Sequence, residues 1–363
     1  TVGYGYYKDF KVKYKFAKFG LVYKDAEGNK VKKSDFIRKK GLTQNTYGMV
    51  YNTNYKDEHW DVIGGLNLQQ FRGNHWGYLT YIANQDAEKQ FLGSNGKYKY
   101  YDSDAHKYDY SAFIKASYRF ADYWNAFADL QYRRVEYKTD GINDKFIAQA
   151  DGSYKNQELN INEKYNFFNP KAGISFNKDG HKAYASVAYS NREPERNNFT
   201  DNFNYPFPKE EKLLDVEFGY QYQNAWVHAN VNAYYSRLDN VTEWTCFYFD
   251  DINSFSYVSS TGNTKEYYGV EAGLKFKLAS YLDLKFIGTI SEAKYIDDAN
   301  VRYLNSTQGT YNDDILRCTG MRESGTPLTA AGAGFSYHQG GWFIDLNGNY
   351  YDRIYLSYST YYR

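Results

Sequence analysis

The sequence lacks a long hydrophobic run and an excess of charge of either sign. Mean hydropathy over the 363 residues is −0.78, and no stretch of about 18 consecutive apolar residues occurs. A membrane-spanning helix needs about 20 such residues, so helical spans are excluded. The 44 Lys and Arg residues nearly balance the 43 Asp and Glu residues. A chain without a basic block is not expected to bind nucleic acid.

Cysteine, histidine and proline are also scarce. The two cysteines, Cys246 and Cys318, cannot form a disulfide framework, and a single bridge between them or two unpaired thiols are equal alternatives. No two of the six histidines stand at the spacing of metal ligands, and no nucleophile elbow or phosphate loop occurs. The sequence therefore predicts no metal site, no cofactor and no enzyme activity.

Aromatic residues are abundant and follow a regular pattern. Phe, Trp and Tyr make up 20% of the chain, and 43 residues are Tyr. From 214 to 235, apolar residues alternate with polar or small ones on both sides of a short turn at 223–225. This is the period of a β-hairpin with one apolar face, and helical spacing of Ala and Leu is absent. The predicted fold class is therefore all-β.

The hairpin pattern recurs and predicts about thirteen strands of about ten residues each. A partial strand covers 2–8, and six hairpins follow: 47–56 with 60–71, 108–120 with 124–137, 171–177 with 181–191, 214–222 with 227–235, 268–278 with 282–291, and 328–337 with 342–351. Long polar links join the hairpins: 72–107, 138–167, 192–213, 236–266 and 292–327. Strands of this length, with short and long connections in alternation, are typical of a transmembrane antiparallel β-barrel. A soluble β-sandwich fits the long links poorly.

Two further patterns favour a barrel. Aromatic residues stand next to the short turns, as at a membrane interface, and include Trp60, Trp124, Trp226 and Trp342. The polar face of the strands is expected to line a wet or plugged lumen, and includes Glu217, His228, Asn230 and Asn232. About eight strands enclose only side chains or one small ligand, so thirteen strands imply a wide lumen.

Three segments resemble a known family. They are 168–173 (FNPKAG), 189–198 (YSNREPERNN) and 210–220 (EEKLLDVEFGY). Together they resemble the barrel of TonB-dependent outer-membrane receptors, in the form typical of Bacteroidetes, over essentially the whole chain. The resemblance implies part of a plugged barrel of about 22 strands, with short periplasmic turns and long extracellular loops. It also implies an N-terminal plug and a segment that contacts TonB.

The chain departs from the family pattern at its ends. No plug and no TonB-contact segment precede Thr1, and thirteen strands are fewer than about 22. A sheet open at both edges would leave backbone groups unpaired in lipid. Residues 1–363 are therefore expected to be a transmembrane β-barrel domain that is incomplete at both ends, with the plug domain absent from this chain.

Charged and aromatic residues of the long links are the predicted site residues. Arg192, Glu193 and Arg196 lie in the corner that resembles the family, and we expect them to contact the plug; an ordinary salt network at the rim is the alternative. Aromatic residues of two links are expected to bind ligand through their large contact area: Trp244, Phe247, Tyr248, Phe249, Tyr303 and Tyr311. Mutual packing of these links is an alternative.

The function that the resemblance implies is TonB-dependent active import of a scarce nutrient, such as an iron chelate, haem or cobalamin, across the bacterial outer membrane. The expected partners are outer-membrane lipid, TonB through a segment not in this chain, a small nutrient ligand and, in some branches of the family, a surface lipoprotein. A passive porin-like channel or a protein-export translocator barrel is the alternative. A structural or adhesive β protein is a third interpretation.

Overall fold

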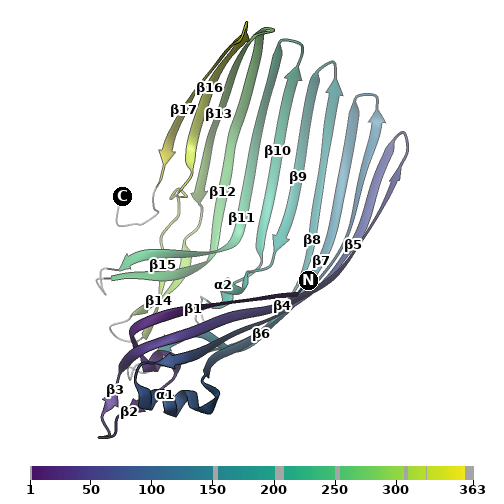
Figure 1. Cartoon of the computed structure of the whole chain (residues 1–363). Helices are drawn as coiled ribbons and strands as arrows, with labels where there is room; N and C mark the ends of the chain where they lie inside the picture. Colours follow the sequence, from purple (N-terminus) through teal and green to yellow (C-terminus); the bar gives the residue numbers. More distant parts are fainter. Residues whose placement is uncertain are drawn as a thin grey trace.

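The chain forms one long antiparallel sheet. The structure, a computed structural model, describes residues 2–149, 154–200, 208–249, 254–305, 310–323 and 325–355. Thirteen strands pair in chain order: β1 (Val2–Lys15), β4 (Lys33–Lys56), β5 (Trp60–Ile82), β6 (Tyr98–Ala121), β7 (Trp124–Ala148), β8 (Tyr154–Lys178), β9 (His181–Arg192), β10 (Glu211–Gln223), β11 (Val227–Phe249), β12 (Ser254–Ala279), β13 (Leu282–Tyr295), β16 (Pro327–Gln339) and β17 (Trp342–Ile354). Two more, β14 (Ala299–Asn305) and β15 (Thr310–Leu316), form a ribbon that pairs with β12. Figure 1 shows the sheet curving as part of a barrel wall, with the short turns along its upper edge. The predicted antiparallel strands and short-turn hairpins are confirmed.

Most strands are longer than the sequence pattern predicts. β4, β5, β6, β7, β8, β11 and β12 contain 23 to 26 residues each. The predicted links 72–107, 138–167 and 236–266 are therefore wrong in extent, because most of their residues belong to these strands. Link 292–327 contains β14 and β15, and link 192–213 contains the short helix α2 (Arg196–Thr200). Beyond a bilayer both faces of a strand meet water or protein, so apolar and polar residues no longer alternate.

The register separates an apolar face from a polar face. On β10, Val216, Phe218 and Tyr220 are 42%, 56% and 39% exposed. Their partners on β9 and β11 are also apolar or small. Rows of exposed large apolar side chains are unfavourable in water, so this face is the lipid face. Glu217, which alternates with these residues, lies on the lumen face.

A hydrophobic core holds the connections at the end of the sheet opposite the short turns. Phe16 and Phe19 of the 3-10 helix η1 (Phe16–Phe19) are 1% exposed, and both ring centroids lie 5.0 Å from that of Phe36 on β4. Helix α1 (Gln85–Leu92) adds Ala87 and Leu92 to this core. No helix in the described part of the chain is long and apolar enough to span a membrane.

Candidate functional site

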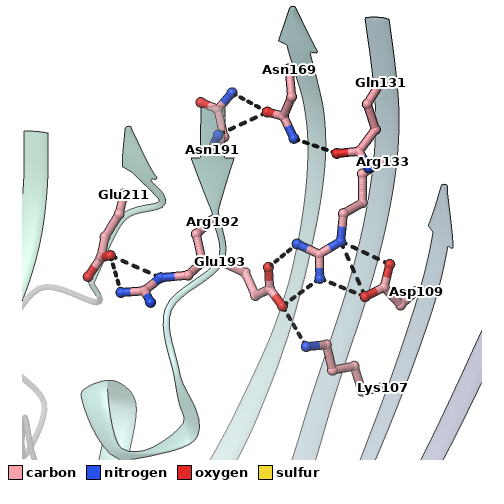
Figure 2. Close-up of polar contacts among 9 residues, drawn as sticks. All are labelled: Lys107, Asp109, Gln131, Arg133, Asn169, Asn191, Arg192, Glu193 and Glu211. Atoms are coloured by element: carbon pink, nitrogen blue, oxygen red, sulfur yellow. Dashed lines mark hydrogen bonds and ion pairs between the residues drawn. The ribbon is translucent and has the colours of Figure 1, made fainter. Parts of the chain in front are cut away.

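Arg133, on the lumen face of β7, joins two carboxylates. Its Nε and Nη2 atoms donate to Asp109 of β6 at 3.0 and 2.6 Å, and its Nη1 and Nη2 atoms donate to Glu193 at 2.7 and 3.0 Å. Lys107 of β6 donates to the same Glu193 carboxylate at 2.5 Å. Figure 2 shows the four side chains converging from β6, β7 and the segment after β9. We call these four residues the Arg133 cluster.

Register and backbone chemistry explain why these residues meet. Ser111 of β6 lies opposite Arg133, and Asp109 is two residues further along the same face, a diagonal that a long side chain spans. Glu193 follows the last residue of β9 and precedes Pro194. Proline has no N–H for a strand ladder, so β9 ends there and the Glu193 side chain reaches across the lumen face.

The charges of the cluster compensate one another. The side chains of Glu193 and Asp109 are only 10% and 11% exposed. Burial opposes ionisation of Glu193, but hydrogen bonds from Lys107 and Arg133 outweigh it and hold the pKa of Glu193 below its ordinary value. Glu193 is therefore ionised at neutral pH, and charge-assisted hydrogen bonds hold the cluster together.

Arg192, predicted together with Glu193, points the other way. Its Nε atom donates to Glu211 of β10 at 3.0 Å, and its side chain is 62% exposed. Next to it, the backbone N–H of Asn191 donates to Asn169 Oδ1 at 2.9 Å. Arg192 thus forms an ion pair at the rim of the sheet and is not part of the Arg133 cluster.

Arg196 fastens α2 to the lumen face. Its Nη1 atom donates to Thr139 Oγ1 at 2.8 Å and its Nη2 atom to Ser103 Oγ at 3.2 Å. Phe199 of α2 is buried against Leu159 and neighbouring residues of β8. The segment after β9 is therefore folded onto the inner wall of the sheet.

A pocket of about 450 Å³ lies beside the cluster, and its lining includes His75, Lys107, Glu193 and Arg196. Burial and the positive charges of Arg196 and Lys40 lower the pKa of His75 to about 4, so its imidazole is neutral at pH 7. The pocket presents charges of both signs and a neutral donor–acceptor ring. The rest of the lining is largely apolar, so the pocket combines ionic groups with apolar surface.

The other predicted lumen residues lie on the expected face but nearer the short turns. Glu217 faces Tyr234 in the register of β10 and β11, and Asn232 accepts a hydrogen bond from Tyr184 at 2.9 Å. His228 and Asn230 alternate with Val227 and Val231 on β11, and so share this face. The structure does not bring these four residues to the Arg133 cluster.

The six aromatic ligand candidates lie on strands, so their expected place in loops is wrong. Their positions are on β11 for Trp244, Phe247, Tyr248 and Phe249, on β14 for Tyr303, and on β15 for Tyr311. Backbone pairing continues through these segments, which the alternation pattern could not reveal. Their side chains lie outside the described part of the structure, so their ligand role stays a prediction.

Cys318 is a buried, free thiol whose Sγ atom donates to the Asp297 carbonyl at 3.3 Å. Burial raises the pKa of Cys318 to about 11. The side chain of Cys246 lies outside the described residues. Of the two alternatives for these cysteines, the structure has the unpaired thiol at Cys318.

Sequence reasoning missed three members of the cluster, Lys107, Asp109 and Arg133. The available signal was the alternation itself, which puts 107, 109 and 133 on the polar face near the ends of two predicted strands. In the described residues, no group of His, Cys, Asp and Glu could hold a metal ion. The Arg133 cluster is a set of compensated ions, and charge-assisted hydrogen bonds of this kind can fix the position of a neighbouring polar segment.

The sheet and its lumen face have known counterparts. The family described as TonB dependent receptor-like, beta-barrel matches residues 1–363. The chain belongs to this family. The resemblance drawn from residues 168–220 is confirmed at this level, and the Bacteroidetes form stays a prediction. No curated protein matches the sequence.

Solved structures of other receptors share the fold. The copper transporter OprC aligns with a TM-score of 0.61 and 14% identity, over 86% of this chain and 45% of that chain. The siderophore receptor PiuA from Acinetobacter baumannii aligns with a TM-score of 0.53 and 14% identity, over 89% of this chain and 47% of that chain. The ferric yersiniabactin uptake receptor FyuA from Yersinia pestis aligns with a TM-score of 0.51 and 13% identity, over 85% of this chain and 42% of that chain. The chain spans less than half the length of these three chains, and at such identities the likeness concerns the fold.

Membership of the TonB-dependent receptor family orients the barrel. The family consists of outer-membrane transport receptors. The short turns at the upper edge in Figure 1 are periplasmic, and the long strand ends with α1, α2, β14 and β15 are extracellular. The Arg133 cluster therefore faces the lumen, toward the extracellular end of the bilayer.

Proposed function

We propose that the receptor containing this chain actively imports a small, scarce nutrient, that TonB supplies the energy, and that the Arg133 cluster docks a plug domain. The observation that carries the proposal is a charge-compensated cluster on the lumen face of a TonB-dependent receptor barrel. The adjoining segment 193–200 is folded inward, where a plug would lie. The plug and the TonB-contact segment belong to parts of the receptor outside this chain.

The cargo class we propose is an iron chelate, haem, cobalamin or a similar compound. The similar structures include a copper transporter, a siderophore receptor and a ferric yersiniabactin uptake receptor, which supports a metal-bearing cargo. We further propose that the aromatic residues on β11, β14 and β15 contact this cargo. A surface lipoprotein is the additional partner that the proposal allows.

Uptake in cells that express the full-length receptor tests the proposal. We expect accumulation of a ferric chelate or haem that stops when TonB is deleted or the proton gradient is collapsed. Uptake that continues in both cases would indicate the passive channel instead. Arg133→Gln is expected to slow energised uptake and to expose the plug to protease. Arg134→Gln is the matched control, because Arg134 is the next residue and lies on the opposite face. Unchanged uptake and unchanged plug protection in Arg133→Gln would refute plug docking.

A further inference from the structure

Positive charge is concentrated in one segment near the start of the chain. Residues 8–40 contain twelve Lys and Arg residues and four Asp and Glu residues, whereas the whole chain contains 44 and 43. Many of these lysines alternate with other residues, so no contiguous basic block marks the segment in the sequence. In a β-ribbon, alternate residues share a face, and a spaced set of lysines therefore becomes a basic surface.

That surface forms on the two-stranded ribbon of β2 (Tyr23–Lys24) and β3 (Lys30–Val31), in the connection between β1 and β4. Tyr23 lies opposite Val31 and is 5% exposed, so this pair of positions faces the hydrophobic core. Lys24 lies opposite Lys30, and both are exposed on the other face. The alternation continues one step on each side, and we call the resulting face the basic tip: Val22, Lys24, Lys30 and Lys32.

The charges of the basic tip repel one another. Side chains directly opposite each other in an antiparallel pair have Cβ atoms about 4.5–5.5 Å apart, and like charges there are destabilising. Lys24 and Lys30 form such a pair. Within residues 8–40, the described ion pairs involve Lys11, Arg38 and Lys40, and none of them involves a lysine of the basic tip. The ammonium groups of the tip are therefore available to an external anion.

Neighbouring carboxylates do not neutralise the tip. Asp25 Oδ1 accepts two backbone N–H groups, at 2.7 and 3.1 Å, and so closes the turn between β2 and β3. Helix α1 packs against the same core and carries Asp86 and Glu88, which form no ion pair with the tip in the described structure. Residues 13–33 contain seven lysines and two acidic residues, Asp25 and Glu27, so the surroundings of the tip remain positive.

The hydrophobic core behind the tip fixes its position. The ring centroid of Tyr23 lies 5.6 Å from that of Phe16 in η1 and 6.2 Å from that of Phe91 in α1. The N–H of Phe16 also donates to the carbonyl of Lys32 at 3.1 Å. The lysines are thus presented on a fixed ribbon, which lowers the conformational entropy lost when a partner binds.

The tip lies on the extracellular side, away from the membrane. In Figure 1 the ribbon of β2 and β3 is at the end of the molecule farthest from the short turns. β4 contains 24 residues between the ribbon and a short turn, whereas a tilted strand crosses the hydrocarbon layer in about 9–11 residues. About half of β4 therefore separates the tip from the hydrocarbon layer.

The side chains of the tip favour an acidic protein segment over other polyanions. Val22 is 60% exposed beside the lysines, so the tip offers an aliphatic contact as well as charge. Proteins that bind single-stranded nucleic acid stack its bases on exposed aromatic rings. The one aromatic residue of the ribbon, Tyr23, is turned into the core. A peptide segment that combines carboxylates with an aliphatic side chain matches the lysines and Val22 together.

We propose that the basic tip docks an acidic segment of a second protein outside the cell. Lys24, Lys30 and Lys32 pair with the carboxylates of that segment, which removes their mutual repulsion, and Val22 packs on an aliphatic side chain. Charge complementarity to fixed, uncompensated lysines carries the inference. The docking is independent of the cargo that the lumen transports.

Binding of a synthetic peptide to the full-length receptor in detergent tests the proposal. The probe is a short fluorescent peptide of alternating Glu and Val, a peptide of alternating Gln and Val is the comparison, and fluorescence anisotropy measures the affinity of each. We expect the wild-type receptor to bind the Glu peptide about tenfold or more tightly than the Gln peptide. The triple variant of Lys24, Lys30 and Lys32 to Gln should lose most of that difference. The matched control changes three exposed lysines of β7 and β8 to Gln, namely Lys138, Lys155 and Lys164, and is expected to bind as wild type does.

Two further variants keep the test decisive if the Gln variant folds poorly. The triple Arg variant at the same positions is expected to retain binding, and the triple Glu variant is expected to bind a peptide of alternating Lys and Val in place of the Glu peptide. Equal binding of the Glu and Gln peptides by the wild-type receptor would overturn the proposal. So would undiminished binding by a Gln variant that shows the heat-modifiable migration of a folded barrel. Displacement of the Glu peptide by single-stranded DNA, heparin or lipid A vesicles at equal charge concentration would assign the tip to another polyanion, and would overturn the proposal as well.

Discussion

Breaking the contact between Arg133 and Glu193 should loosen the segment that covers the lumen wall. Arg133 donates to Glu193 at 2.7 and 3.0 Å, and the Glu193 side chain is 10% exposed. A hydrogen bond to a charged group contributes about 1.5–3 kcal/mol, and water screens this pair less than a surface pair. For Arg133→Gln, Glu193→Gln and the double variant, we expect a coupling free energy of about 1–3 kcal/mol. That coupling changes the local opening equilibrium by roughly 5- to 150-fold.

Native-state hydrogen exchange of the amides in 194–200 measures this coupling in the full-length receptor. Arg134→Gln is the control on the opposite face, where Arg134 pairs with Glu136 and both side chains are well exposed. Water screens that exposed pair, so its loss should leave exchange in 194–200 unchanged. A coupling below about 0.5 kcal/mol between Arg133 and Glu193 would refute the energetic reasoning.

The coupling free energy between Arg133 and Glu193 should depend on pH in a defined way. The native pKa of Glu193 is lowered, whereas an unfolded Glu titrates near 4.3. The stabilisation is therefore fully present above about pH 4.3 and is lost as the pH falls through the lower native value. We expect the coupling between Arg133 and Glu193 to be the same at pH 5 as at pH 7 and to disappear in strong acid. Loss of the coupling between pH 7 and pH 5 would contradict this assignment.

Three further predictions concern other parts of the barrel. Phe218→Lys puts a charge in the middle of the lipid face and should lower the free energy of unfolding by about 2–4 kcal/mol, measured by refolding from urea into lipid vesicles. Glu217→Lys on the lumen face should lower it much less. Equal losses for the two variants would argue against the assigned faces. Cys318, buried and with its pKa raised to about 11, should resist maleimide at pH 7 until the receptor is unfolded, and rapid labelling of the native protein would contradict its burial. His75 has a native pKa of about 4, against about 6.5 when unfolded, so stability measured by thermal unfolding should fall as the pH drops from 6.5 to 4. His75→Gln should remove that part of the pH dependence of stability. An identical pH dependence in the variant would show that His75 is not the titrating group.

The faces of the strands could be predicted from the sequence, because lipid and lumen differ in polarity. Val216 and Phe218 alternate with Glu217, and the register confirms that order. The strand ends could not be predicted in this way. Near Thr139 and Gly141, for example, β7 continues although neither face meets lipid, so no alternation marks it.

The candidate site was predicted only in part. The Arg-Glu-Pro corner indicated Glu193, but its partner Arg133 lies 60 residues away in the sequence, and Asp109 lies 24 residues from Arg133. Such contacts depend on which residues face each other across three strands, and one sequence contains no direct record of that register. Arg192 contacts β10, whereas Arg196 contacts β6 and β7. This difference depends on where β9 ends, just before Pro194.

Under the proposed function, the length of the strands has a consequence for how a ligand would be captured. Because β4 to β8, β11 and β12 continue beyond the bilayer as paired strands, the residues at the extracellular entrance are held by backbone hydrogen bonds before any ligand arrives. A pre-organised surface loses less conformational entropy on binding than a flexible loop does. Selectivity at this entrance would then depend on the identity of single side chains along stiff strands, and exchanging those side chains would alter specificity without refolding the entrance.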